Sequence, residues 1–237
     1  MKSAIRYVLF PALALGLLLA ATAYAQDQKK KDEKKTEDKK SDDKKGDDKK
    51  DPTKEATTEY YPLKEGMTWT YKANDKTLTV SVAGFDKKGD PAVSCARLET
   101  RERRPAGETN NPLATEHVAV KADGVYRYAF EGTDAKPPLR FLLLPVDSPE
   151  KRWSFDSKVG SADVKGSFTL AKEKNPVKVL ATEYKDVVTV TSEGLEIEKQ
   201  KVAITYYFAA KVGMIKQVVD VGGTKVTIEL ESFQEKK

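Results

Sequence analysis

Apolar and polar side chains alternate along most of the chain that follows residue 59. At 67–73, Met, Trp, Tyr and Ala occupy every second position, with Thr, Thr and Lys between them. After the turn-forming triplet "NDK" at 74–76, the stretch 77–82 alternates in the same way. A period of two is typical of strands that bury one face. The two stretches are therefore predicted to form an antiparallel hairpin.

Strand-like runs recur to the end of the chain, separated by Gly, Pro, Asn and Asp. These further runs are 92–103, 117–121, 124–130, 139–145, 153–155, 166–171, 177–180, 186–194, 195–210, 213–221 and 225–233. Tight two-residue turns are predicted at Asp123-Gly124 and at Gly222-Gly223.

No long segment shows a 3.6-residue apolar period, and short helices are considered only at 148–151 and near Tyr184. We predict an all-β fold, in which a single antiparallel domain of about ten to twelve strands forms a strongly curved sheet. A half-barrel and a sandwich are the expected arrangements. A closed barrel is a third possible arrangement, because the period of two does not distinguish among the three.

A phrase near the start of this region is restated in mid-chain. "YYPLKEGMTWTY" (60–71) and "LLPVDSPEKRWSF" (143–155) share a Pro, a short turn, a Trp and a second aromatic residue, and they contain both tryptophans, Trp69 and Trp153. Each phrase is predicted to place an apolar anchor in the core, to interrupt pairing at Pro and to start a new strand.

The restated phrase predicts two related halves, 59–134 and 139–233. They would share one core, because either half alone is too short to bury enough surface. A chance similarity between two strand starts is the alternative.

Several segments together resemble a family of uncharacterised exported bacterial proteins. The segments are "YYPLKEGMTWTYK", "GVYRY", "LLLPV", "RWSF", "ATEYKDVVTVTSEG" and "ITYYFAAKVGMIKQVV…IELESF". Members open on Pro-Leu-x-x-Gly-x-x-Trp, repeat it in mid-chain and close on Tyr-Tyr-Ala-x-x-Val-Gly-hydrophobic-Lys. Gly66 fits the opening, whereas the mid-chain copy has Pro149 and Glu150 where a Gly turn is expected. The resemblance covers most of 60–233. It implies a secreted all-β domain, is compatible with ligand binding, and assigns no catalytic residue.

Residues 1–25 have the features of a cleavable signal peptide. A basic start is followed by an apolar stretch (7–20) and by the small residues Ala23 and Ala25. The apolar stretch is shorter than the ~20 residues of a spanning helix, so a retained anchor is the weaker alternative. We expect an exported protein, periplasmic or extracellular, that is soluble after signal cleavage and has no transmembrane segment in the mature chain.

Residues 26–58 are predicted to form a disordered, charged tether. Its low-complexity repeats "KDEKK", "TEDKK", "SDDKK" and "GDDKK" have no aliphatic or aromatic residue to bury. Both charge signs alternate, so the tether is a polyampholyte rather than the one-sidedly basic tail of a nucleic-acid-binding protein. Signal cleavage also removes two of the positive charges behind the formal net charge of +5, which leaves the domain 59–237 nearly neutral. No nucleic-acid partner is expected.

Few side chains of the domain suit catalysis. His117 is the only histidine and is predicted to lie exposed on a strand, while Cys95 is the only cysteine and is predicted to be a buried thiol. No His/Cys cluster, nucleophile motif or phosphate-binding loop is recognisable.

The charged run 97–104 is interpreted as a solvated strand edge. We predict no catalytic residue, no metal site and no cofactor. A hydrolase whose carboxylates converge only in the fold is an alternative.

Aromatic side chains are the strongest candidates for binding. Five of them would line an apolar groove if a curved sheet is incompletely filled: Trp69, Tyr71, Trp153, Tyr206 and Phe208. The leading hypothesis is a non-catalytic exported envelope protein that acts as a binding or interaction module, with an apolar small molecule or an envelope protein as partner. A periplasmic carrier of a lipid or acyl chain is the alternative. The ligand and the oligomeric state stay open.

Overall fold

The computed structural model describes residues 55–56, 58–103 and 111–235. The predicted signal peptide and nearly all of the predicted tether lie outside these residues, as does Arg104 of the charged run. The described chain consists of strands, turns and loops and contains no helix, so the short helices considered above are wrong. The prediction of a single antiparallel all-β domain is confirmed.

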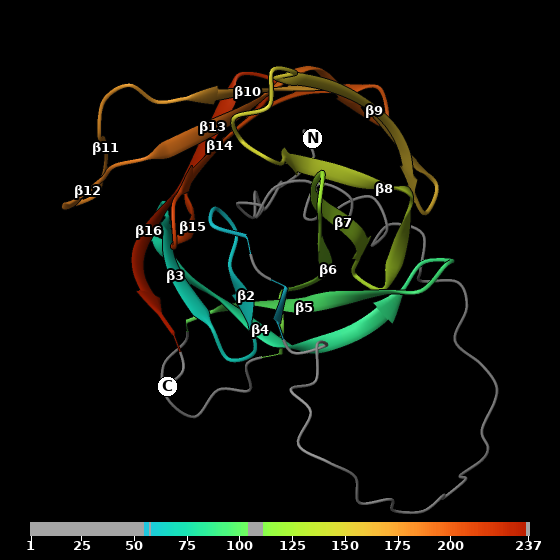
Figure 1. Cartoon of the computed structure of the whole chain (residues 1–237), viewed down its shortest axis with the longest axis horizontal. Helices are drawn as coiled ribbons and strands as arrows, with labels where there is room; N and C mark the ends of the chain where they lie inside the picture. Colours follow the sequence, from blue (N-terminus) through green and yellow to red (C-terminus); the bar gives the residue numbers. More distant parts are fainter. Residues whose placement is uncertain (1–54, 57, 104–110, 236–237) are drawn as a thin grey trace, which may run out of the picture.

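Twelve strands form one closed ring in which each pairs antiparallel with both neighbours (Figure 1). In ring order they are β10 (Ala162–Lys172), β13 (Val187–Ile197), β14 (Gln200–Ala209), β15 (Gly213–Val221), β16 (Thr224–Gln234), β3 (Thr68–Ala73), β4 (Lys76–Lys88), β5 (Val93–Glu102), β6 (Ala114–Lys121), β7 (Gly124–Phe130), β8 (Thr133–Leu143) and β9 (Arg152–Val159). The domain is therefore a closed barrel, the third of the arrangements considered above, and not a half-barrel or a sandwich. Strands of open and closed curved sheets have the same period of two, so alternation could not predict closure.

Two short strand pairs lie outside the ring. β1 (Glu55–Ala56), within the range assigned to the tether, pairs with β2 (Leu63–Lys64), and β11 (Val177–Val179) pairs with β12 (Thr182–Tyr184). In Figure 1, β2 lies within the outline of the ring, whereas the β11–β12 hairpin projects away from it at the upper left.

The barrel interior is filled by large side chains. Trp69, Tyr71, Leu78 and Val80 are buried at alternate positions of β3 and β4, as predicted. Eight strands give an interior that side chains just fill, and barrel diameter grows with strand number. A ring of twelve therefore needs bulkier contents. One connected set of aromatic rings provides them: Tyr61, Phe141, Trp153, Phe155, Phe168, Tyr206 and Phe208.

Two of the predicted turns are confirmed. Asn74 and Asp75 link β3 to β4, and Gly222 and Gly223 link β15 to β16. Asn74 and both glycines have positive φ, as tight turns between twisted strands require.

The predicted turn at Asp123-Gly124 is wrong by one residue. Lys121 pairs with Gly124, so Ala122 and Asp123 form the loop between β6 and β7. Gly124 instead starts β7, where an added Cβ atom would lie 2.6 Å from the carbonyl oxygen of Leu142 on β8. The glycine is needed for this close approach of two strands and not for the turn.

The two tryptophans lie on opposite walls of the barrel. Trp69 is on β3 and Trp153 is on β9, six positions apart in the ring of twelve. The indole N–H of Trp69 donates to the carbonyl oxygen of Val212 (2.7 Å), and that of Trp153 donates to the carbonyl oxygen of Arg140 (2.9 Å). Each tryptophan thus anchors its own wall. The relation between two halves stays a prediction.

The wall between β8 and β9 has little backbone pairing. Two residue pairs connect β8 to β9, whereas eight connect β9 to β10. β8 contains Pro137 and Pro138, which have no N–H group to donate to a neighbouring strand. Ser157 and Trp153 on β9 donate side-chain hydrogen bonds to carbonyl oxygens of β8 instead. Side chains therefore hold this part of the barrel closed.

Replacing Ser157 by Ala should lower the free energy of unfolding by about 1–3 kcal/mol, because the Pro137 carbonyl oxygen loses its donor at 2.6 Å. Ser154 lies on the same strand with an exposed side chain. Ser154→Ala should therefore change the free energy of unfolding by less than about 0.5 kcal/mol. Urea unfolding measures both values, and equal effects would contradict the role of Ser157 in joining β8 to β9.

Candidate functional site

A cavity of about 40 Å³ lies in the barrel interior. A buried water needs about 10–15 Å³ of such space, so the cavity has room for roughly three to four non-hydrogen atoms. Most of its wall is apolar. Six aromatic residues contribute to that wall: Tyr61, Trp69, Tyr71, Phe141, Tyr206 and Phe208.

Glu116 and Arg127 form an ion pair at this cavity. They lie on the neighbouring strands β6 and β7, and Nε of Arg127 donates to Oε2 of Glu116 at 2.8 Å. Glu116 is 7% exposed and Arg127 is 5% exposed. The guanidinium carbon also lies 5.3 Å from the ring centroid of Phe141. Taking two charges out of water costs several kcal/mol per ion, so each partner depends on the other.

A β-bulge lets Arg127 and Phe130 both face the interior. The register of β6 and β7 shifts between His117 and Val118, so that Val118 faces Arg127 while His117 faces Ala129. Tyr128 is the extra residue on β7. Without it, strict alternation would place Arg127 on the face opposite to Phe130, which is buried inside the barrel. A bulge re-aims a side chain in this way at the cost of local pairing.

Four buried polar atoms at the cavity have no hydrogen-bond partner of normal geometry among the described residues, although Arg127 lies close enough to the Tyr206 hydroxyl to lower its pKa through a side-chain hydrogen bond. They are Nη1 of Arg127, the hydroxyl oxygen of Tyr206, and both Nε2 and Oε1 of Gln217. Gln217 is 0% exposed and faces Tyr206 across β15 and β14. A buried polar atom without a partner costs about 1–3 kcal/mol, and native proteins rarely leave one. The cavity therefore has unused hydrogen-bonding capacity on three neighbouring side chains.

The protonation states of the cavity are set by burial. Burial raises the pKa of Tyr61, Tyr71 and Tyr206, while the positive charge of Arg127 opposes the rise for Tyr61 and Tyr206. All three phenols therefore keep their protons. For Arg127, burial lowers the pKa, but Glu116 and the surrounding groups raise it above its usual value. The cavity thus presents a charged guanidinium and neutral hydroxyl groups.

Tyr61 is the cavity-lining residue that does not come from a strand of the ring. It comes from the segment between β1 and β3 and is partly exposed, although it also lines the cavity. Its ring makes edge-to-face contacts with Phe141 and Phe208, at centroid distances of 5.4 and 5.9 Å. Tyr61 therefore forms part of the cavity wall and packs against two of its other aromatic residues.

The residues of the predicted groove separate into two places. Trp69, Tyr71, Tyr206 and Phe208 line the cavity. Trp153 does not line it and packs against Phe168 instead, with a centroid distance of 5.7 Å. The cavity therefore does not join the two tryptophans.

Sequence reasoning missed the polar half of the site. Two of its members carry a signal in hindsight, because Glu116 alternates with Val118 and Gln217 alternates with Val219 on otherwise apolar faces. Arg127 alternates with Val125 in the same way, but the extra residue Tyr128 breaks the alternation before Phe130.

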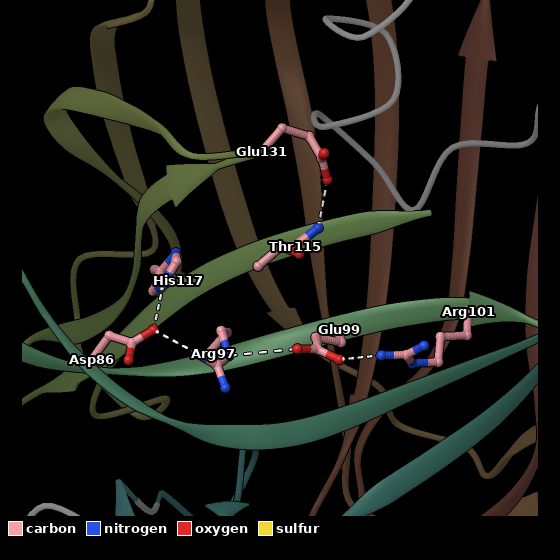
Figure 2. Close-up of polar contacts among 7 residues, drawn as sticks. All are labelled: Asp86, Arg97, Glu99, Arg101, Thr115, His117 and Glu131. Carbon is pink, nitrogen blue, oxygen red and sulfur yellow. Dashed lines mark hydrogen bonds and ion pairs between the residues drawn. The ribbon is translucent and has the colours of Figure 1, made fainter. Parts of the chain in front are cut away.

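His117 lies on the outer face of the barrel and not in the cavity. It is 6% exposed, so the prediction of an exposed histidine is wrong. Its Nε2 atom lies 2.9 Å from Oδ2 of Asp86, and the same oxygen accepts from Nη1 of Arg97 at 3.4 Å (Figure 2). The hydrogen bond from His117 lowers the pKa of Asp86, burial opposes this, and the positive charge of Arg97 adds to it.

The charged run continues along the outer face of β5. Glu99 pairs with Arg97 (3.5 Å) and with Arg101 (2.7 Å), and on the neighbouring strand the backbone N–H of Thr115 donates to Glu131 (Figure 2). β5 pairs with β4 on one side and with β6 on the other. The prediction that the charged run forms a solvated strand edge is therefore wrong. These charges form ion pairs on a continuous wall.

Other chemistry has little support in the part of the chain that the structure covers. Cys95 is fully buried as predicted, and burial raises the pKa of its thiol to about 11. Within 55–56, 58–103 and 111–235, no cluster of three or more His, Cys, Asp or Glu side chains could hold a metal ion. Over the same residues, no helix is long and apolar enough to cross a membrane.

Comparisons with protein-family models, curated proteins and solved structures found no match for this chain. Its class is therefore defined by its own fold and site, an antiparallel barrel of twelve strands with a largely apolar cavity that bears a few buried polar groups. The resemblance to exported bacterial proteins stays a prediction.

Replacing Glu116 by Gln should lower the free energy of unfolding by about 3–5 kcal/mol, because Arg127 is left charged and buried without its partner. Replacing both partners, Glu116→Leu with Arg127→Met, should recover most of this loss. Chemical denaturation of the two variants measures the difference.

The matched control is Glu231→Gln, which breaks an ion pair with Lys72 whose side chains are 44% and 38% exposed. This surface pair should contribute less than about 1 kcal/mol. A loss for Glu116→Gln no larger than that of the control would show that the interior pair is already solvated.

Proposed function

We propose that this protein is a non-catalytic binding module that holds a small molecule inside its barrel. The observation that carries the proposal is the group of four unpartnered polar atoms on Arg127, Tyr206 and Gln217, buried at one cavity with an aromatic wall. Ligand sites combine predominantly apolar walls with a few placed polar groups. The signal-peptide pattern of residues 1–25 supports an exported location, with the charged repeats as a tether for the barrel.

The geometry gives less support to the other hypotheses. A carrier of an acyl chain needs a long groove, whereas this cavity is about 40 Å³ and excludes Trp153. A glycosidase-like hydrolase needs two nearby carboxyl groups, but Glu116 is the one carboxylate among the cavity-lining residues and it pairs with Arg127. For an interaction module, the β11–β12 hairpin offers Leu180, 44% exposed, as a single apolar contact.

Replacing Gln217 by Leu should abolish binding of small ligands and leave the fold intact, because Leu fills similar volume and has no unpaired polar atom. Gln234→Leu is the matched control, since Gln234 lies exposed at the end of β16. A ligand-observed NMR screen of the full chain with charged and uncharged fragments of about three to four non-hydrogen atoms measures binding.

Fragments should bind the natural protein and the Gln234→Leu variant and lose at least about tenfold in affinity for Gln217→Leu. If every fragment binds the natural protein and Gln217→Leu equally well, or none binds, the interior is not a ligand site and the proposal is wrong.

A further inference from the structure

We infer that the ligand of the cavity is an uncharged molecule that carries a primary amide or ureido group, held by Gln217 together with Arg127 and Tyr206. This inference rests on the proposed function, and it names the chemistry of the same site. It follows from the hydrogen-bonding capacity, the charge and the size of the cavity.

The unpartnered atoms form a specific set of donors and acceptors. Gln217 offers an NH₂ group and a carbonyl oxygen side by side, and both are unpartnered. A primary amide carries the complementary pair, so it can donate to Oε1 of Gln217 and accept from Nε2 at the same time. The second lone pair of the ligand carbonyl can then accept from Nη1 of Arg127, and the second N–H of the ligand can donate to the hydroxyl oxygen of Tyr206. An amide therefore uses every unpartnered atom of the set.

Other small polar groups leave part of this set unused. A ketone accepts hydrogen bonds but donates none, so Oε1 of Gln217 would stay unpaired in a buried site. A carboxylate has the same deficiency. Leaving a buried acceptor without a donor costs about 1–3 kcal/mol, which corresponds to a loss in affinity of roughly fivefold to a hundredfold.

The charge at the cavity also favours an uncharged ligand. Arg127 is neutralised by Glu116 at 2.8 Å, so the positive charge already has its counter-ion. An anionic ligand would bring an additional buried charge with no further cation among the lining residues. A cationic ligand would meet the guanidinium of Arg127. Burial of an unpaired charge is far more costly than burial of a hydrogen-bonded amide.

The size of the cavity limits what can lie between these groups. About 40 Å³ matches the roughly three to four non-hydrogen atoms of an amide or urea group. A larger ligand would place this group at Gln217 and extend beyond the cavity.

Three compounds of equal size test the inference: acetamide, acetone and acetate, each with four non-hydrogen atoms. The full chain is labelled with ¹⁵N, and the side-chain NH₂ signals of Gln217 are followed during titration with each compound. Acetamide should shift these signals saturably, with a dissociation constant on the order of millimolar. Acetone and acetate should bind at least about tenfold more weakly.

Two variants control for the position of binding. Gln217→Leu should remove acetamide binding, measured through the backbone signals of the cavity strands, whereas Gln234→Leu should retain it. The backbone spectrum of each variant reports whether the fold is kept. Acetamide binding that survives Gln217→Leu would overturn the assignment of the amide group to Gln217.

The outcomes separate this inference from the proposed function. If acetate binds most tightly, the site binds an anion through Arg127. If acetone binds as well as acetamide, binding does not need a ligand N–H that donates to Oε1 of Gln217. Either result overturns the amide inference while the cavity remains a ligand site. If no compound shifts the Gln217 signals, water alone serves the cavity, and both the inference and the proposed function are overturned.

Discussion

A ring of twelve antiparallel strands is wider than ordinary aliphatic side chains can fill, and this interior volume shapes the rest of the structure. A connected set of aromatic rings occupies most of it, from the partly exposed Tyr61 to Trp153 on the far wall. Aromatic residues bury large area and pack through edge and offset contacts, so they fill a broad interior with few side chains. What they leave unfilled is the small cavity at Gln217.

Polar groups inside this aromatic core require a reason, because an apolar residue would pack there at lower cost. Arg127 lies on the interior face that also buries Val125, and it is held there by Glu116. Gln217 has neither atom of its amide paired within the described structure. Buried polar groups that are not needed for folding are typical of sites that recognise a ligand. The aromatic wall gives the site a low local dielectric constant, and this strengthens each hydrogen bond formed within it.

The residue pattern predicted which side chains face inward better than it predicted the overall shape of the sheet. Alternation at 67–82 correctly placed Trp69 and Tyr71 inside, because inward and outward positions depend only on neighbouring residues. Closure of the ring depends on pairing between β16 and β3, which lie at opposite ends of the domain and have no local signature. The same limit applies to the site. The apolar wall was predictable from its residue types, whereas the pairing of Arg127 with Glu116 was not, because a single extra residue on β7 shifts the register between β6 and β7.

The central claim is that the unpartnered atoms of Arg127, Tyr206 and Gln217 serve a molecule in the barrel interior. A crystal structure of the full chain, at a resolution that separates ordered water from an organic group, tests it most directly. The account predicts density in contact with the Gln217 amide, and within hydrogen-bond distance of Nη1 of Arg127 and the Tyr206 hydroxyl. A structure in which Gln217, Arg127 and Tyr206 pair with other protein groups and close the interior would contradict it.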